Sequence, residues 1–286
     1  MYAITGVTGH VGGATARALL AQGASVRAIA RDAERARASI GRDADVAVAD
    51  FTDRAALAAA LAGCRGAFVM LPTIPTFTDT DHRRMADSIA SAVADSSVEH
   101  VVMLSAIGAD LAAGNGPIRW LHHLENRLRE TGALLTAIRS PHFQEKVEAV
   151  LEAATGTGVY PVFGDSADVP VPMAATRDIG AAAALALASP PPASEVVDLE
   201  APSYTERQVA DQLGELLGTA LDVVTIPRAG WLDAMTGAGV PLLLATELDE
   251  LYDAGNRGLL QPRGDRRHHC TTELKETLRH VVPTAS

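Results

Sequence analysis

The sequence contains little lysine and little cysteine, and it lacks an apolar run long enough to span a membrane. Only two residues of 286 are lysine, Lys146 and Lys275, so arginine supplies nearly all of the basic side chains. The two cysteines, Cys64 and Cys270, lie far apart and form no metal-binding or redox motif. We therefore expect no metal site and a reducing, cytoplasmic environment. No apolar stretch approaches about 18 residues and no signal-like segment precedes the first strand, so neither a membrane span nor a signal peptide is expected.

The composition is that of a globular protein. Apolar residues make up 48% of the chain and charged residues 21%, which excludes extensive disorder. The net charge is -11 and the basic residues are scattered, so we expect neither nucleic acid nor an anionic membrane as a partner. The expected partner is a small molecule, and the expected assembly is a monomer or a homodimer.

A glycine-rich turn near the N-terminus carries the clearest functional signal. Residues 2–5 predict a short apolar strand, and residues 13–20 predict a helix. Between them, Gly6, Gly9 and Gly12 are spaced as G-x-x-G-x-x-G, whereas the common motif is G-x-G-x-x-G. Glycine lets backbone N–H groups approach a phosphate closely, and a helix start adds partial positive charge. The order of strand, turn and helix therefore favours a dinucleotide site over an ordinary tight turn.

The end of the next predicted strand, residues 25–30, indicates which dinucleotide is bound. Folds that take NAD usually place a carboxylate here to hold the ribose 2′-OH, but this chain has Arg31. A guanidinium suits a 2′-phosphate because its donors form a fixed fork. Asp32 follows directly, so Arg31 is alternatively solvated while Asp32 caps a helix over residues 33–39. We favour NADP(H) over NAD(H).

Strands and helices alternate through the first half of the chain. Strands are predicted at 2–5, 25–30, 45–49, 66–71, 99–104 and 133–138, and helices at 10–22, 32–39, 53–62, 80–96, 117–131 and 142–154. Apolar strands separated by helices imply an α/β fold with a Rossmann-type, doubly wound parallel sheet. Its ligand is expected beyond the carboxyl ends of the strands.

The regular alternation of predicted strands and helices ends at about residue 155. Glycines and prolines interrupt a short strand region, and further helices are predicted at 176–188, 204–217 and 240–255, with strands at 195–199 and 221–226. We therefore expect residues 1–155 to form the NAD(P)-binding Rossmann domain. Residues 156–286 are expected to form a smaller α+β lobe on the substrate side, packed on the sheet edge and not independent.

Several segments together resemble the atypical short-chain dehydrogenase/reductases, and most closely the NmrA-like branch and its NADPH-quinone oxidoreductases. These segments are Ile4–Gly12, Ala30–Asp32, Ala49–Asp53, Val102–Gly108 and Thr136–Phe143. The resemblance spans most of the chain and is strongest over residues 1–145. The glycine motif is specific for the superfamily, and the later motifs indicate the branch.

The resemblance implies an NADP(H) cofactor and assigns residues to it. The pyrophosphate would be lined by Gly6, Thr8, Gly9, His10, Val11 and Gly12. Arg31 would hold the 2′-phosphate, and Asp50 and Phe51 would flank the adenine. Leu71 and Pro72 would pass near the ribose on the nicotinamide side. Asp50 is alternatively a cap for a helix that begins near residue 53.

The chain departs from ordinary short-chain dehydrogenases because it has no Tyr-x-x-x-Lys relay. The residues four positions after the tyrosines are Gly6, Gly164, Gln208 and Asn256. NmrA-like relatives often have a lysine four positions before a family glutamate, here Glu125, but this chain has Leu121 there. Without a relay, a product phenolate (conjugate-acid pKa about 10) is easier to form than an alkoxide (about 16).

Glu125 and Ser105 are two candidate catalytic residues. Glu125 lies on the apolar stripe of its helix and is expected to be partly buried near His122. Alternatively, Glu125 pairs with Arg129 on a wet face. Ser105 ends a strand, where it either contacts the substrate or nicotinamide or caps a helix.

His142 is the third candidate, because it follows the strand at 133–138 on the expected ligand edge. It either donates a proton to a developing oxyanion or shapes the pocket. These features favour an NADP(H)-dependent reductase of quinone-like or conjugated carbonyl compounds. The alternative is a non-catalytic NADP-binding regulator that senses redox state and binds a partner protein.

Overall fold

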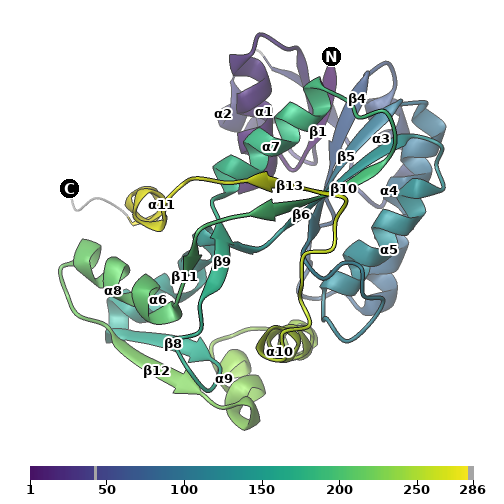
Figure 1. Cartoon of the computed structure of the whole chain (residues 1–286). Helices are drawn as coiled ribbons and strands as arrows, with labels where there is room; N and C mark the ends of the chain where they lie inside the picture. Colours follow the sequence, from purple (N-terminus) through teal and green to yellow (C-terminus); the bar gives the residue numbers. More distant parts are fainter. Residues whose placement is uncertain (42–43, 283–286) are drawn as a thin grey trace.

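The computed structural model describes residues 1–41 and 44–282 and contains a main sheet of eight parallel strands (Figure 1). The order across the sheet is β13-β10-β6-β5-β4-β1-β2-β3. Its strands are β1 (Tyr2–Thr5), β2 (Val26–Ala30), β3 (Asp45–Val48), β4 (Gly66–Val69), β5 (His100–Ala106), β6 (Leu134–Ser140), β10 (Glu195–Glu200) and β13 (Arg266–His269). The predicted doubly wound parallel sheet is confirmed.

Helices cover both faces of this sheet because its central strands are apolar on both sides. One face packs against α3 (Arg54–Leu61), α4 (Asp79–Ser96) and α5 (Ile118–Arg129) in one hydrophobic core. The other face packs against α1 (His10–Ala21), α2 (Ala33–Ile40) and α7 (Thr176–Ala188) in a second core. The strand order reverses where β1 lies between β2 and β4, so the ligand edge is at the carboxyl end of β1.

A smaller lobe lies below the carboxyl edge in Figure 1. It contains a three-stranded sheet, β11-β9-β7, and a two-stranded sheet, β12-β8. Its strands are β7 (His142–Phe143), β8 (Val159–Phe163), β9 (Val171–Ala174), β11 (Ser203–Tyr204) and β12 (Asp222–Ile226). Its helices are the 3-10 turns η1 (Gln144–Val147) and η2 (Arg228–Gly230) with α6 (Glu148–Thr157), α8 (Glu206–Leu217), α9 (Trp231–Gly237), α10 (Leu242–Asn256) and α11 (Leu274–Val281).

The structure corrects two details of the sequence prediction. Part of the segment 156–286 lies in the main sheet layer rather than in the lobe, because β10 and β13 extend that sheet past β6 and α7 packs against α1. The helix expected at 142–154 begins later, at Glu148, because His142 and Phe143 first pair with β9 and a 3-10 turn follows. No helix of the described residues is long and apolar enough to cross a membrane.

The contact between α1 and α7 gives a test of the packing. A Cβ added at Gly180 would lie 2.5 Å from the Cβ of Ala14 and 2.7 Å from the backbone nitrogen of Thr15. We therefore expect Gly180→Ala to lower the free energy of unfolding in urea by about 1–3 kcal/mol, because the helices must separate. The control is Gly156→Ala in α6, where a Cβ meets no atom within 4 Å. Equal stabilities of the two variants would contradict this packing.

Candidate functional site

The glycine turn brings the first turn of α1 against the end of β1. The backbone of Gly6 has a φ of +65°, and the Gly9 N–H donates to the Gly6 carbonyl at 2.9 Å. A Cβ at Gly12 would lie 2.5 Å from the Thr5 carbonyl oxygen, and one at Gly6 would lie 2.6 Å from a sulfur of Met70. Gly6 and Gly12 are therefore required by the backbone geometry itself.

The N-terminus of α1 is open to an anionic ligand. Gly9 is the N-cap residue, no side chain caps the helix, and its first turn has no acidic residue. A Cβ at Gly9 would touch only the Gly6 carbonyl, at 3.4 Å, so the protein fold does not itself exclude a side chain there. Uncapped N–H groups and the helix dipole both favour a phosphate. The turn therefore fits the pyrophosphate of a dinucleotide.

The other residues assigned to the pyrophosphate differ in exposure. Thr8 and His10 are exposed beside the turn, and the His10 Nε2 lies 3.1 Å from a carboxylate oxygen of Glu148 in α6. Val11 is buried in the core between the sheet and α1. Its side chain thus points away from the turn, and only its backbone is available to a ligand.

Arg31 directly follows β2, and its guanidinium is available to a ligand. Its side chain is exposed and forms no ion pair within the described residues. Asp32 is the N-cap of α2 and accepts from two backbone N–H groups, at 2.9 and 3.1 Å, so its carboxylate is occupied. The pKa of Asp50 is lowered by hydrogen bonds from Thr52 and, to a smaller degree, by the charge of Arg31. Arg31 and Asp50 therefore face the same region.

The segments assigned to adenine and ribose follow β3 and β4, and β1 and β2 lie between these two strands in the sheet. Asp50 accepts from the backbone and hydroxyl of Thr52 at 2.8 and 2.6 Å, and it is not the cap of α3, which is the residue at position 53. Phe51 is half-buried against the core on that face. Leu71 is buried in the same core, and Pro72 after it is half-buried.

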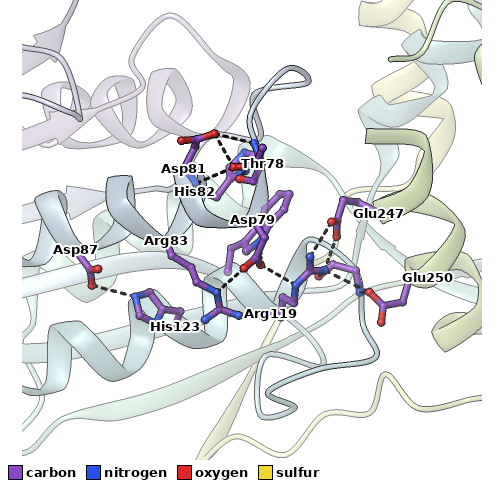
Figure 2. Close-up of polar contacts among 12 residues, drawn as sticks. Thr78, Asp79, Asp81, His82, Arg83, Asp87, Arg119, His123, Glu247 and Glu250 are labelled. Atoms are coloured by element: carbon purple, nitrogen blue, oxygen red, sulfur yellow. Dashed lines mark hydrogen bonds and ion pairs between the residues drawn. The ribbon is translucent and has the colours of Figure 1, made fainter. Parts of the chain in front are cut away.

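A polar cluster around Asp79 fixes the starts of α4 and α5 (Figure 2). The Asp79 carboxylate accepts from Arg83 at 2.9 Å, Arg119 at 3.0 Å and the Trp120 indole at 2.9 Å. Burial would raise the pKa of Asp79, but these hydrogen bonds lower it to about 2. His82 stacks on Trp120 with ring centroids 3.7 Å apart and accepts from the backbone of the segment after β4.

Arg119 also ties the lobe to this cluster. It donates to both carboxylate oxygens of Glu247, at 2.7 Å for one of them, and to Glu250 at 3.3 Å. Both glutamates belong to α10, so Figure 2 shows this helix held against the starts of α4 and α5. Those helix starts follow strands, and α10 is therefore fixed at the carboxyl edge of the sheet.

Ser105 and Glu125 meet inside the protein. The Ser105 hydroxyl donates to Glu125 at 2.6 Å, and Arg139 donates to both carboxylate oxygens at 2.9 and 2.8 Å. Arg129 adds a contact at 3.1 Å. The Glu125 side chain is only 1% exposed, so it is deeply buried and also paired with Arg129, which combines the two expected alternatives. The His122 ring nitrogen Nδ1 instead lies 2.8 Å from a backbone carbonyl, and no hydrogen bond joins it to Glu125 among the described residues.

His142 is separated from β6 by Pro141 alone and pairs with β9 in the lobe. Burial and, to a smaller degree, the charge of Lys146 together lower the pKa of His142 to about 3. The imidazole is therefore neutral near pH 7, where it can share a hydrogen bond but does not carry a proton as an imidazolium ion. A role for His142 as an imidazolium proton donor is therefore disfavoured. That His142 shapes the substrate pocket stays a prediction.

Sequence reasoning overlooked two charged residues near this edge, Arg139 and Lys146. An arginine inside an apolar strand was the available signal, since a buried charge requires a partner. The scarcity of lysine was the signal for Lys146. Among the residues that the structure describes, no cluster of three or more histidine, cysteine, aspartate or glutamate side chains could hold a metal ion.

Two characterised relatives cover nearly the whole chain. The NAD(P)H azoreductase of Xenophilus azovorans is 29% identical over 257 residues, 88% of this chain and 86% of the relative. Quinone oxidoreductase 2 of Escherichia coli (strain K12) is 26% identical over 288 residues, 98% of each protein. Among solved structures, the NADPH-dependent quinone oxidoreductase of Escherichia coli complexed with NADPH superposes with a TM-score of 0.82 at 24% identity. That match covers 98% of this chain and 99% of the other.

These similarities agree with the fold and with the glycine turn described above. The similarity to the solved structure confirms the Rossmann-type fold. The closer assignment to an NmrA-like branch stays a prediction. A family model described as NAD(P)H-binding matches residues 6–167, more than half of the sequence. The chain therefore belongs to this NAD(P)H-binding family.

Proposed function

We propose that this protein is an NADPH-dependent reductase of quinone-like or other conjugated acceptors. The observation that carries the proposal is the glycine turn, whose uncapped helix start fits a pyrophosphate. Arg31, exposed at the end of the next strand, supplies the charge that suits a 2′-phosphate. Both lie at the carboxyl edge, where an open α/β sheet binds its ligand.

Two arguments indicate the class of acceptor: the chain has no Tyr-x-x-x-Lys relay, and its relatives are named for conjugated acceptors. Without a Tyr-x-x-x-Lys relay, the fold suits a product that is a phenolate better than one that is an alkoxide. The relatives named above are an NAD(P)H azoreductase and a quinone oxidoreductase, whose acceptors are conjugated. A flat, conjugated acceptor is consistent with both arguments.

The protein's own residues divide the work of such a reaction. When bound, NADPH would supply the hydride. The first turn of α1 and Arg31 would bind its phosphates, and Asp50 and Phe51 would border the adenine. The Ser105–Glu125–Arg139 cluster is internally satisfied, so we propose that it holds β5, α5 and β6 in register beneath the site rather than moving protons.

The proposed reaction is tested by NADPH oxidation against a panel of quinones, azo dyes and simple ketones. We expect turnover with quinones and little or none with simple ketones, because only the ketone product is a strongly basic alkoxide. Absorbance at 340 nm follows the reaction, and product analysis identifies the hydroquinone. Tight NADPH binding with no turnover of any acceptor would favour the regulatory alternative instead.

Cofactor choice is tested at Arg31. We expect the native protein to bind NADPH at least tenfold more tightly than NADH, because a charge-assisted contact to phosphate is worth about 1.5–3 kcal/mol. Arg31→Ala should weaken NADPH binding and leave NADH binding nearly unchanged, as measured by calorimetry. The control is Arg37→Ala, an exposed arginine in the last turn of α2. Equal affinities of the native protein for both nucleotides would refute the role of Arg31.

A further inference from the structure

The segment that follows β6 is anchored by two of its side chains. The Gln144 amide donates to the backbone carbonyls of Met173 at 3.0 Å and of Thr272 at 2.9 Å. The Glu145 carboxylate accepts from the backbone of Thr176 at 2.9 Å and from its hydroxyl at 2.6 Å. These bonds tie the segment to β9, to the start of α7 and to the loop before α11. The backbone that carries the neighbouring side chains is therefore held firmly.

Lys146 follows these anchors but shares none of their bonds. Its side chain is exposed and has no ion pair or hydrogen bond among the described residues. The surrounding protein nevertheless lowers the pKa of its ammonium group by desolvation. The other lysine, Lys275, lies 2.9 Å from Glu215 at the surface. Lys146 is thus a cation on a fixed backbone that lacks a counter-ion within the described part of the chain.

The glycine turn lies close to the same segment. Glu148 begins α6, two positions after Lys146, and its carboxylate is 3.1 Å from His10 in the glycine turn. On the other side of the anchors, His142 is near enough for the charge of Lys146 to lower its pKa. The helix start that fits the pyrophosphate, His142 and Lys146 therefore lie along one edge of the sheet, where the reacting ends of the ligands are expected.

The other polar groups near this edge are poorly suited to donate a proton. His142 is neutral near pH 7, because burial depresses its pKa. Glu125 is enclosed by two arginines and the Ser105 hydroxyl. The pKa of an ammonium is ordinarily close to that of a phenol, so a lysine whose pKa is lowered by desolvation can protonate a phenolate.

We propose that Lys146 contacts the oxygen of the quinone-like acceptor and protonates it. This inference rests on the proposed function. A hydride supplied by bound NADPH carries two electrons and one proton, and it converts a quinone into the hydroquinone monoanion. The ammonium of Lys146 then breaks one N–H bond and transfers that proton to the anionic oxygen, which gives neutral hydroquinone. The lysine amine regains a proton from water.

The turnover of three variants tests the proton transfer. We expect Lys146→Met to lower kcat with a quinone by about 10²-fold while the Kd for NADPH stays unchanged. Lys146→Arg keeps the charge but does not release its proton, so it should also lose turnover. The matched control, Lys275→Met, should behave like the native protein. A fall in NADPH affinity that accounts for the whole loss in Lys146→Met would overturn the proposal, because Lys146 would then hold the cofactor.

A binding measurement tests the contact without any turnover. The probe is 4-nitrophenol, which is yellow only as the phenolate, titrated into the protein with NADP⁺ present. We expect the native protein and Lys146→Arg to bind the phenolate at least tenfold more tightly than Lys146→Met does. Equal phenolate affinity in all three proteins would overturn the proposal, even where quinones are reduced. Lysine-dependent phenolate binding without quinone turnover would support the contact and refute the proposed function.

Discussion

The close approach of Gly12 to the end of β1 is the constraint on which the ligand edge depends. A Cβ at this position would lie 2.5 Å from the Thr5 carbonyl oxygen, so any side chain would push α1 away from the strand. With glycine there, the uncapped N–H groups of the helix start lie directly beside the carboxyl end of β1. This position is also the switch point of the sheet, where the strand order reverses. One local packing requirement thereby shapes the proposed phosphate site.

The buried ion pair between Glu125 and Arg139 lies close to that edge and joins α5 to β6. The side chains of Glu125 and Arg139 are 1% and 7% exposed, and their contact links α5 to β6. Removing one partner from such a pair ordinarily costs about 3–5 kcal/mol, because the other charge stays buried. The Glu125 carboxylate contacts two arginines and a serine hydroxyl, which is consistent with the supporting role proposed above. The proposed proton donor, Lys146, instead lies in the segment between β6 and α6.

The helix α10 of the lobe is held against the carboxyl edge of the sheet by ion pairs. Arg119 binds Glu247 and Glu250 of α10 while it also binds Asp79 at the start of α4. The Arg119 side chain is only 16% exposed, so these contacts are less screened than those of a surface ion pair. The lobe is consequently attached to the sheet layer at the edge where the acceptor is expected to bind.

Much of the first half of the fold could be predicted from the sequence, because most of its strands are apolar and the helices α2, α3 and α4 begin at recognisable capping side chains. The glycine spacing and the position of Arg31 likewise predict the cofactor edge before any coordinates are known. The strand β13, Arg266–His269, was missed because it is a polar edge strand with no apolar alternation. The pairing of Glu125 with Arg139 was also missed, since it joins two elements and neither residue alone specifies its partner.

A crystal structure of the protein with NADP⁺ bound would locate the cofactor relative to the proposed site. We expect the pyrophosphate at the start of α1, the 2′-phosphate beside Arg31, and the nicotinamide directed toward the segment that carries His142 and Lys146. A nucleotide bound elsewhere, or bound with its adenine at that segment and its nicotinamide near Arg31, would contradict this expectation.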